Sequence, residues 1–161
     1  MSDDKPDLSS PGGLASPGPG MGGWRVLELL DETACMELLA SGSLGRLVYT
    51  SRYGPTALPV TYRIDEGSIV LGTWDPALFD EDLRTGIEQA EYRVAVEADQ
   101  IDVEAREGWF VVVRGAAHHL DTEAEQVSFI DAGLEPWVEG VPEHFIRVNP
   151  SSIWGNRIRR E

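Results

Sequence analysis

Short β-forming runs, separated by turn residues at close intervals, constrain the fold of this 161-residue chain more than any other feature. Three such runs follow one another at 45–50, 57–64 and 68–74. Gly54-Pro55 lies between the first two, and Asp65-Glu66-Gly67 separates the next two. Turn residues so closely spaced between β-forming segments are typical of strands that pair with their sequence neighbours. The pattern therefore predicts an antiparallel meander.

Three more runs predict strands further along the chain. They occupy 92–99, 109–120 and 145–160, and the last is expected to be interrupted at Asn149-Pro150. The continuous apolar stretch that opens the second of these runs predicts burial on both faces. Six antiparallel strands in so short a chain favour a closed or nearly closed barrel, because closure removes exposed sheet edges. We therefore expect a mainly β fold with flanking helices, built on a six-stranded antiparallel barrel.

Three helices are expected between the strands. Asp31 is a suitable N-cap for a short helix that continues to Ala40. Asp75-Pro76 offers a capping residue followed by proline at the first helical position, which predicts a second helix. Thr122 and Glu125 have the spacing of a capping box, which predicts a third.

Residues 1–23 predict a disordered tail, because this segment is rich in Pro, Gly and Ser and has almost nothing to bury. Three of its glycines, Gly18, Gly20 and Gly23, match the spacing of a dinucleotide-binding loop. Such a loop needs a strand before it and a helix after it, whereas a Pro-rich coil precedes this one. We interpret the match as coincidental and expect one folded domain over residues 24–161.

The charge of the chain narrows its possible partners. Asp and Glu total 28 against 13 Lys and Arg, for a formal net charge of −15. A chain this acidic repels phosphodiester backbones and anionic lipids, so neither nucleic acid nor a membrane is an expected partner. The N-terminus has no signal-peptide pattern, and no apolar run is long enough to span a bilayer. With a single cysteine and no internal disulfide, a cytoplasmic location is expected.

No motif for side-chain catalysis or metal binding stands out. A GxSxG nucleophile elbow is absent from the sequence, and Cys35 falls on the apolar side of its expected helix, as a structural cysteine does. His118 and His119 are neighbours on an expected strand and so point to opposite faces, while His144 is expected in a loop. We predict no metal site and assign no catalytic residue.

Charge is also distributed unevenly along the chain. Residues 75–107 hold eleven acidic residues and three arginines, which is typical of a solvated surface. The stretch 147–161 carries four arginines and one glutamate, and it could hold an anion or pair with the acidic segment. The strand that ends at Thr73 runs into an expected helix N-terminus, where free backbone N–H groups favour a phosphate.

Five segments, in order, resemble the pyridoxamine 5′-phosphate oxidase-like, FMN-binding split-barrel proteins, in particular small actinobacterial-type members. The first three are a Gly-Arg-Leu strand at 45–47, a Pro-Val-x-Tyr strand at 59–62 and a strand end at Gly72-Thr73. The fourth is GWFVVVRGAAHHL, and the fifth is the closing FIRVNPSSIWGNRIRR. The resemblance covers residues 24–160, nearly all of the expected domain.

The resemblance implies a six-stranded split barrel that forms a homodimer, with two flavin sites at the subunit interface. The interface is expected to bury part of the strand around 109–113. Carried onto this chain, the family's pattern places strand residues against FMN, Thr73 near its phosphate, and Trp109 as a contribution from the partner chain. The residues implied for the cofactor are Arg46, Val48, Tyr49, Pro59, Val60, Thr61, Thr73, Trp109, Trp154 and Arg157. The implied activity is that of an oxidoreductase of a small molecule.

The chain departs from the family's pattern after Thr73. FMN-binding members follow the strand with a Gly/Ser-Lys segment that holds the phosphate, whereas WDPALFDEDL here contains no lysine and four acidic residues. Arg84 could compensate, as could Arg46 or Arg52. Two alternatives to FMN therefore stay open: a deazaflavin (F420) cofactor, or a cofactor-free binding or regulatory module. True pyridoxamine 5′-phosphate oxidase activity is less expected, because a phosphorylated substrate needs further basic charge.

Overall fold

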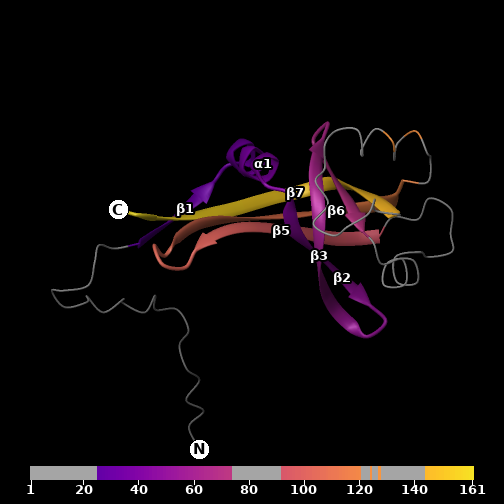
Figure 1. Ribbon diagram of the computed structural model, residues 1–161, viewed down its shortest axis with the longest axis horizontal. Coiled ribbons are helices and arrows are strands. Elements are labelled where there is room, and N and C mark those ends of the chain that lie inside the picture. The colour runs from indigo at the N-terminus through magenta and orange to yellow at the C-terminus, as the bar shows by residue number, and fades with distance from the viewer. Residues whose placement is uncertain (1–24, 74–91, 121–123, 125–126, 128–143) are drawn as a thin grey trace, which may run out of the picture.

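The computed structural model describes residues 25–73, 92–120, 124, 127 and 144–161, which form one helix and seven strands (Figure 1). In the described part of the chain, no helix is long and apolar enough to cross a membrane. The elements are β1 (Arg25–Leu30), α1 (Glu32–Ser41), β2 (Leu44–Ser51), β3 (Gly54–Asp65), β4 (Ser68–Thr73), β5 (Tyr92–Asp102), β6 (Glu107–His119) and β7 (His144–Arg160).

Six of the strands close into a ring, which confirms the predicted barrel. The order β7-β4-β3-β2-β5-β6 returns to β7 through a β6–β7 pairing, and every pairing is antiparallel. In Figure 1 the β2–β3 hairpin runs across the direction of β5 and β7. The ring has no free edge along the strands that it pairs, which is the advantage of closure.

The seventh strand, β1, was not predicted. It pairs only with the C-terminal part of β7, from Arg25 opposite Arg160 to Leu30 opposite Gly155. Leu27 and Leu29 are exposed and alternate with Val26, Glu28 and Leu30, so neither face of the segment is consistently polar. The alternation that identifies a half-buried strand is therefore missing.

The predicted interruption of the last strand at Asn149-Pro150 is wrong. β7 continues through both residues, and a β-bulge falls where Arg114 pairs with Ser152 and Gly115 pairs with Pro150. Pro150 is tolerated because β4 pairs with β7 only as far as Val148 and β1 begins only at Gly155. None of the described strands thus pairs with this edge of β7 at the proline, which has no amide hydrogen to offer.

The core lies inside the ring, on alternate residues of the strands. Its fully buried side chains include Leu47, Tyr62, Val96, Val111 and Val113. A second, smaller cluster on the opposite side of the sheet contains Val70, Leu120 and Phe145. Because side chains alternate across a strand, these two clusters define an inner face and an outer face for the whole barrel.

Helix α1 packs against one side of the barrel as predicted. The Asp31 side chain accepts a 2.8 Å hydrogen bond from the backbone N–H of Ala34, which satisfies a free donor of the first turn. Cys35 and Leu39 are completely buried. A Cβ on Gly155 of β7 would lie 3.1 Å from the Cys35 sulfur, so a glycine is needed for this close approach. The second expected helix, and the third apart from helical Ala124 and Val127, lie outside the described residues.

Tyr62 fixes the helix to the barrel by a buried hydrogen bond. Its phenol donates to the carbonyl oxygen of Leu39 at 2.8 Å, and burial raises its pKa to about 12. We expect Tyr62→Phe to lower the free energy of unfolding by about 1–3 kcal/mol, because the buried carbonyl loses its partner. Urea unfolding followed by circular dichroism measures this. The control, Tyr53→Phe, changes a ring that is 89% exposed and should leave stability unaltered; equal losses in the two variants would refute the assignment.

Candidate functional site

The sheet register brings several of the implied flavin residues onto one surface. Arg46 of β2 lies opposite Pro59 of β3 and Glu97 of β5. Glu97 lies opposite Val112, which lies opposite Trp154. Residues directly opposite in antiparallel strands project to the same face. Arg46, Pro59 and Trp154 therefore share the outer face across five strands.

Val48 belongs to the next row on the same face. It lies opposite Ala57 on one side and Ala95 on the other, and Ala95 lies opposite Arg114. Alanines beside a half-buried valine leave a low, apolar surface between the taller side chains of the neighbouring rows. We call Val48, Ala57 and Ala95 the apolar shelf.

The remaining implied residues are placed differently. Tyr49 and Val60 are buried in the core, on the inner face, and Trp109 is 8% exposed among core residues. Thr61 is almost fully buried. Arg157 lies opposite Trp109 and so also shares its face rather than that of Trp154.

For two of the residues implied for the cofactor, the structure describes no side-chain position. Thr73 ends β4 and pairs with His144 through its backbone, and nothing is described of its side chain. Arg84 and the acidic segment 75–82 lie outside the described residues. The roles of the implied residues toward a cofactor therefore stay predictions.

Two hollows adjoin this surface. The larger has a volume of about 480 Å³ and is lined by Arg46, Pro59, Tyr62, Asp99 and Trp109, among others. The smaller, about 280 Å³, is lined by the shelf residues Val48 and Ala95 together with Thr50, Arg93 and Arg114. Three residues that the resemblance implies for the cofactor therefore line the larger hollow: Arg46 and Pro59 from the outer face, and Trp109 from the inner face. The connection from α1 to β2, at residues 41–43, also lines it.

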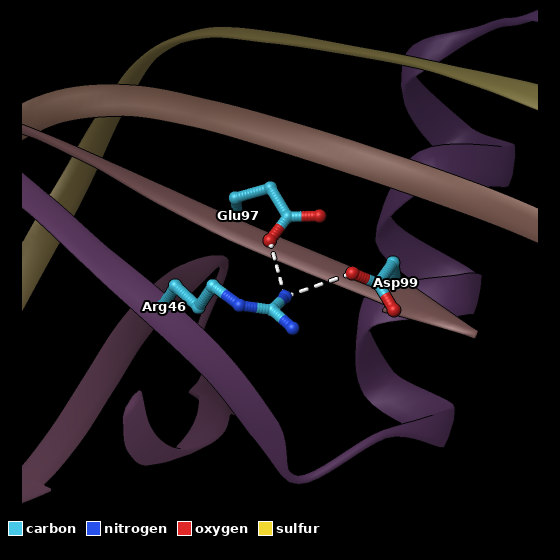
Figure 2. Close-up of polar contacts among 3 residues, drawn as sticks. All are labelled: Arg46, Glu97 and Asp99. Atoms are coloured by element: carbon cyan, nitrogen blue, oxygen red, sulfur yellow. Dashed lines mark hydrogen bonds and ion pairs between the residues drawn. The ribbon is translucent and has the colours of Figure 1, made fainter. Parts of the chain in front are cut away.

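Arg46 is held by two acidic side chains (Figure 2). Its Nη1 atom donates to a carboxylate oxygen of Glu97 at 2.8 Å and to one of Asp99 at 2.8 Å. These hydrogen bonds raise the pKa of the Arg46 guanidinium further, so it stays a cation. One positive charge faces two carboxylates, and a cofactor phosphate at Arg46 would have to displace them.

Sequence reasoning placed Glu97 and Asp99 only within a solvated acidic run. The signal that could have identified them is the alternation of β5, where Val94, Val96 and Ala98 face the core. That pattern puts the intervening acidic residues on the face of Arg46. Their pairing with Arg46 also needs the β2–β5 register, which connects segments far apart in the sequence.

The pKa of Glu97 is raised above its ordinary value. Burial is the largest cause, because it disfavours the charged form, and the neighbouring Asp99 carboxylate adds to it. The hydrogen bond from Arg46 acts in the opposite direction. The cluster therefore carries a carboxylate whose ionisation costs the folded protein free energy.

The described residues offer binding surface rather than side-chain catalysis. Among them, no group of three or more His, Cys, Asp or Glu side chains is arranged to hold a metal ion. Cys35 is buried, and burial raises the pKa of its thiol, which disfavours the reactive thiolate. The chemistry that this surface supports is the binding of a flat, partly apolar molecule.

A protein-family model described as pyridoxamine 5′-phosphate oxidase matches residues 31–157. The chain belongs to the pyridoxamine 5′-phosphate oxidase family. The resemblance seen in its ordered motifs is therefore confirmed, and the match spans every described strand except β1 and the last residues of β7.

Three individual proteins are similar to this one over most of the chain. The uncharacterized protein Rv0080 of Mycobacterium tuberculosis is 34% identical over 129 residues, which cover 80% of this chain and 84% of that protein. The structure of the FAD binding protein from Mycobacterium smegmatis is 28% identical with a TM-score of 0.60, covering 83% of this chain and 100% of that one. A putative pyridoxamine 5′-phosphate oxidase from Corynebacterium glutamicum is 25% identical with a TM-score of 0.63, covering 84% and 95%.

Replacing Glu97 tests the electrostatics of the cluster in this family member. A raised pKa means that the folded protein holds the proton more tightly than the unfolded chain, so ionisation above the ordinary value of 4.5 removes stability. We expect Glu97→Gln to gain free energy of unfolding relative to the wild type between about pH 4 and pH 7. Urea unfolding at the two pH values measures this.

The exposed Glu104 provides the control for that experiment. Glu104→Gln should show the same stability difference from the wild type at both pH values. A Glu97→Gln variant that loses stability relative to the wild type on raising the pH would show that the ion pair with Arg46 outweighs burial.

Proposed function

We propose that this protein binds a flavin on the outer face of β2, β3 and β5 and acts as a homodimeric oxidoreductase of a small molecule. FMN is the expected cofactor, and F420 is the alternative. Family membership and the 28% identical FAD binding protein support the proposal. A cytoplasmic location is part of this proposal, in keeping with the single cysteine.

The observation that carries the proposal is the apolar shelf on the outer face, which lies beside the larger hollow and forms part of the floor of the smaller one. A flavin ring is planar and needs a flat apolar surface with polar groups at its margins. Val48, Ala57 and Ala95 supply such a surface in adjacent strands, and Pro59 adjoins it. The hollow of about 280 Å³ lies over Val48 and Ala95, and the hollow of about 480 Å³ is lined by Arg46 and Pro59 of the next row. These residues fit the ring of the cofactor.

A bound flavin supplies the electron-transfer chemistry, and the protein contributes binding, orientation and electrostatics. In this chain the shelf would orient the ring, and Trp109 would border the larger hollow. The carboxylates of Glu97 and Asp99 keep the guanidinium of Arg46 beside the shelf. This arrangement explains why no nucleophile or general base is needed at the site.

The pairing of Arg46 favours a second candidate function, a cofactor-free binding or regulatory module. Its guanidinium is neutralised by two carboxylates, and the family's lysine segment is absent from the sequence after Thr73. A carboxylate about 4 Å from a phosphate costs about 4 kcal/mol at an effective dielectric constant of 20. Such a module would keep the fold and the shelf but bind no flavin.

Titration with FMN and with F420 distinguishes these functions. We expect freshly purified protein to be yellow, or to quench FMN fluorescence with saturation at micromolar concentration. Ala57→Trp places an indole on the shelf and should weaken binding at least about tenfold, which corresponds to about 1.4 kcal/mol. Val103→Trp, at a position 82% exposed in the β5–β6 turn, is the matched control.

Saturation by F420 alone would establish the deazaflavin alternative. A colourless protein that binds neither FMN nor F420 at high micromolar concentration would refute flavin binding and support the cofactor-free module.

An apolar band on the outer face supports the proposed homodimer. The register places Leu27, Ile158 and Ile101 in one row and Leu29 with Phe110 in the next. Trp154 follows, with its ring against Phe110 at a centroid distance of 5.7 Å. Leu27 is 62% exposed and Leu29 is 77% exposed. Exposing such large apolar side chains to water is unfavourable, so a contiguous band of them indicates an interaction surface.

The band refines the expected interface around 109–113. Trp109, Val111 and Val113 are buried by their own chain, so only the alternate residues Phe110 and Val112 can face a second copy. Within the described residues, β1 also has one unpaired edge, which adds backbone donors and acceptors beside the exposed leucines.

Charged substitutions in the band test the dimer. We expect the wild type to sediment as a dimer at micromolar concentration and Leu27→Asp with Leu29→Asp to sediment as a monomer, because each buried carboxylate would lack a partner. Circular dichroism should show the same strand content in both. Tyr53→Asp with Val103→Asp, at two exposed positions outside the band, should remain dimeric. A monomeric wild type would exclude the proposed assembly.

A further inference from the structure

The smaller hollow differs from the larger one in its charge. Its floor contains Val48, Ala95 and Gly115, and its two long polar side chains are Arg93 and Arg114. Thr50 adds a hydroxyl, and none of the described residues that line the hollow carries a carboxylate. We call this hollow, of about 280 Å³, the arginine groove.

The two arginines can reach the same ligand. Arg93 of β5 lies opposite Ala116 of β6, and Arg114 lies two residues before Ala116 on the same face. Diagonal neighbours of this kind are about 7–8 Å apart at their backbones, well within the reach of arginine side chains. Both side chains line the groove, so an anion bound in it lies within reach of either guanidinium group.

The groove keeps its positive charge. Within the described residues, neither Arg93 nor Arg114 forms an ion pair, whereas Arg46, Arg147 and Arg159 each contact a carboxylate. This is unexpected in a chain with a net charge of −15, where acidic side chains greatly outnumber basic ones. The two guanidinium groups are thus available to an anion from outside the chain.

Arg114 is also held in place. Its guanidinium carbon lies 6.0 Å from the centre of the Trp154 ring, which is cation–π geometry. A guanidinium stacked on a ring still presents N–H donors along its edges, and these match the oxygens of a phosphate or a carboxylate. The indole of Trp154 therefore reports on what Arg114 binds.

We propose that the arginine groove is a binding site for the phosphate or carboxylate of a small molecule whose body is apolar. The arginines supply the charge, and Val48, Pro55 and Ala95 supply apolar contact for the body. The anion belongs either to the flavin itself or to a separate substrate. The site does not depend on flavin binding, since the groove is formed by the chain alone.

Phenyl phosphate is the probe for this site, because it joins a phosphate to a flat apolar ring. Indole N–H signals in ¹H–¹⁵N NMR spectra of the full chain follow the titration, and Trp154→Phe identifies the signal of Trp154. We expect a saturable shift of that signal. Arg93→Gln leaves Arg114 and Trp154 intact and should weaken the affinity about tenfold, the loss of one charge-assisted contact.

Arg106→Gln is the matched control, since Arg106 is an exposed arginine in the β5–β6 turn. It should leave the affinity unchanged. The proposal is overturned if phenyl phosphate does not shift the Trp154 signal of the wild type. It is equally overturned if Arg93→Gln and Arg106→Gln weaken binding alike, because the effect is then one of net charge.

FMN and riboflavin, which lacks the phosphate, distinguish the two sources of the anion. If Arg93→Gln weakens FMN but not riboflavin, the groove holds the phosphate of the flavin. If it weakens neither flavin, but weakens phenyl phosphate binding to the flavin-free protein, the groove holds the anion of a separate molecule that takes the place of the flavin on Val48 and Ala95. A protein that binds phenyl phosphate through Arg93 but no flavin supports the groove and refutes the proposed cofactor.

Discussion

Closure of the sheet through the β6–β7 pairing is the constraint on which the rest of the structure depends. Twelve residues of β6, from Gly108 to His119, pair with β7. This pairing joins the two ends of the strand order β7-β4-β3-β2-β5-β6 into a ring. In a closed ring no strand can slip by one residue without turning its core side chains outward. The register is therefore fixed everywhere, and with it the identity of the residues that share the outer face.

The candidate site follows from this register rather than from any local motif. Arg46, Glu97 and Trp154 come from segments separated by more than fifty residues, and they meet because β2, β5, β6 and β7 are neighbours in the ring. The bulge at Arg114 accommodates an extra residue of β7 at Ser151 without breaking the strand. The sheet thus accommodates Pro150 and the extra residue Ser151 next to the arginine groove, at the point where the β6–β7 pairing is irregular.

The sequence alone predicted the features that depend on neighbouring residues. Glu66-Gly67 forms the second predicted turn, Asp31 caps the helix, and the ordered motifs identify the family, whereas the turn expected at Gly54-Pro55 falls at Arg52-Tyr53 and Gly54-Pro55 opens β3. It did not predict β1, because Leu27 and Leu29 face outward and remove the alternation that identifies a strand. The sequence also did not predict that Glu97 and Asp99 pair with Arg46. A run of acidic residues indicates solvated surface unless the strand register, which the sequence does not reveal, places a cation beside it.

Strand β7 pairs with two strands, β4 and β1, along the same edge. β4 occupies that edge up to Val148 and β1 from Gly155, so of the seven described strands β1 alone can be removed with the six-stranded ring still closed. Its amide protons should consequently exchange with solvent through local opening, at a lower energetic cost than those of the ring. Opening of β1 would therefore uncover the edge of β7 from Gly155 onward without breaking the barrel.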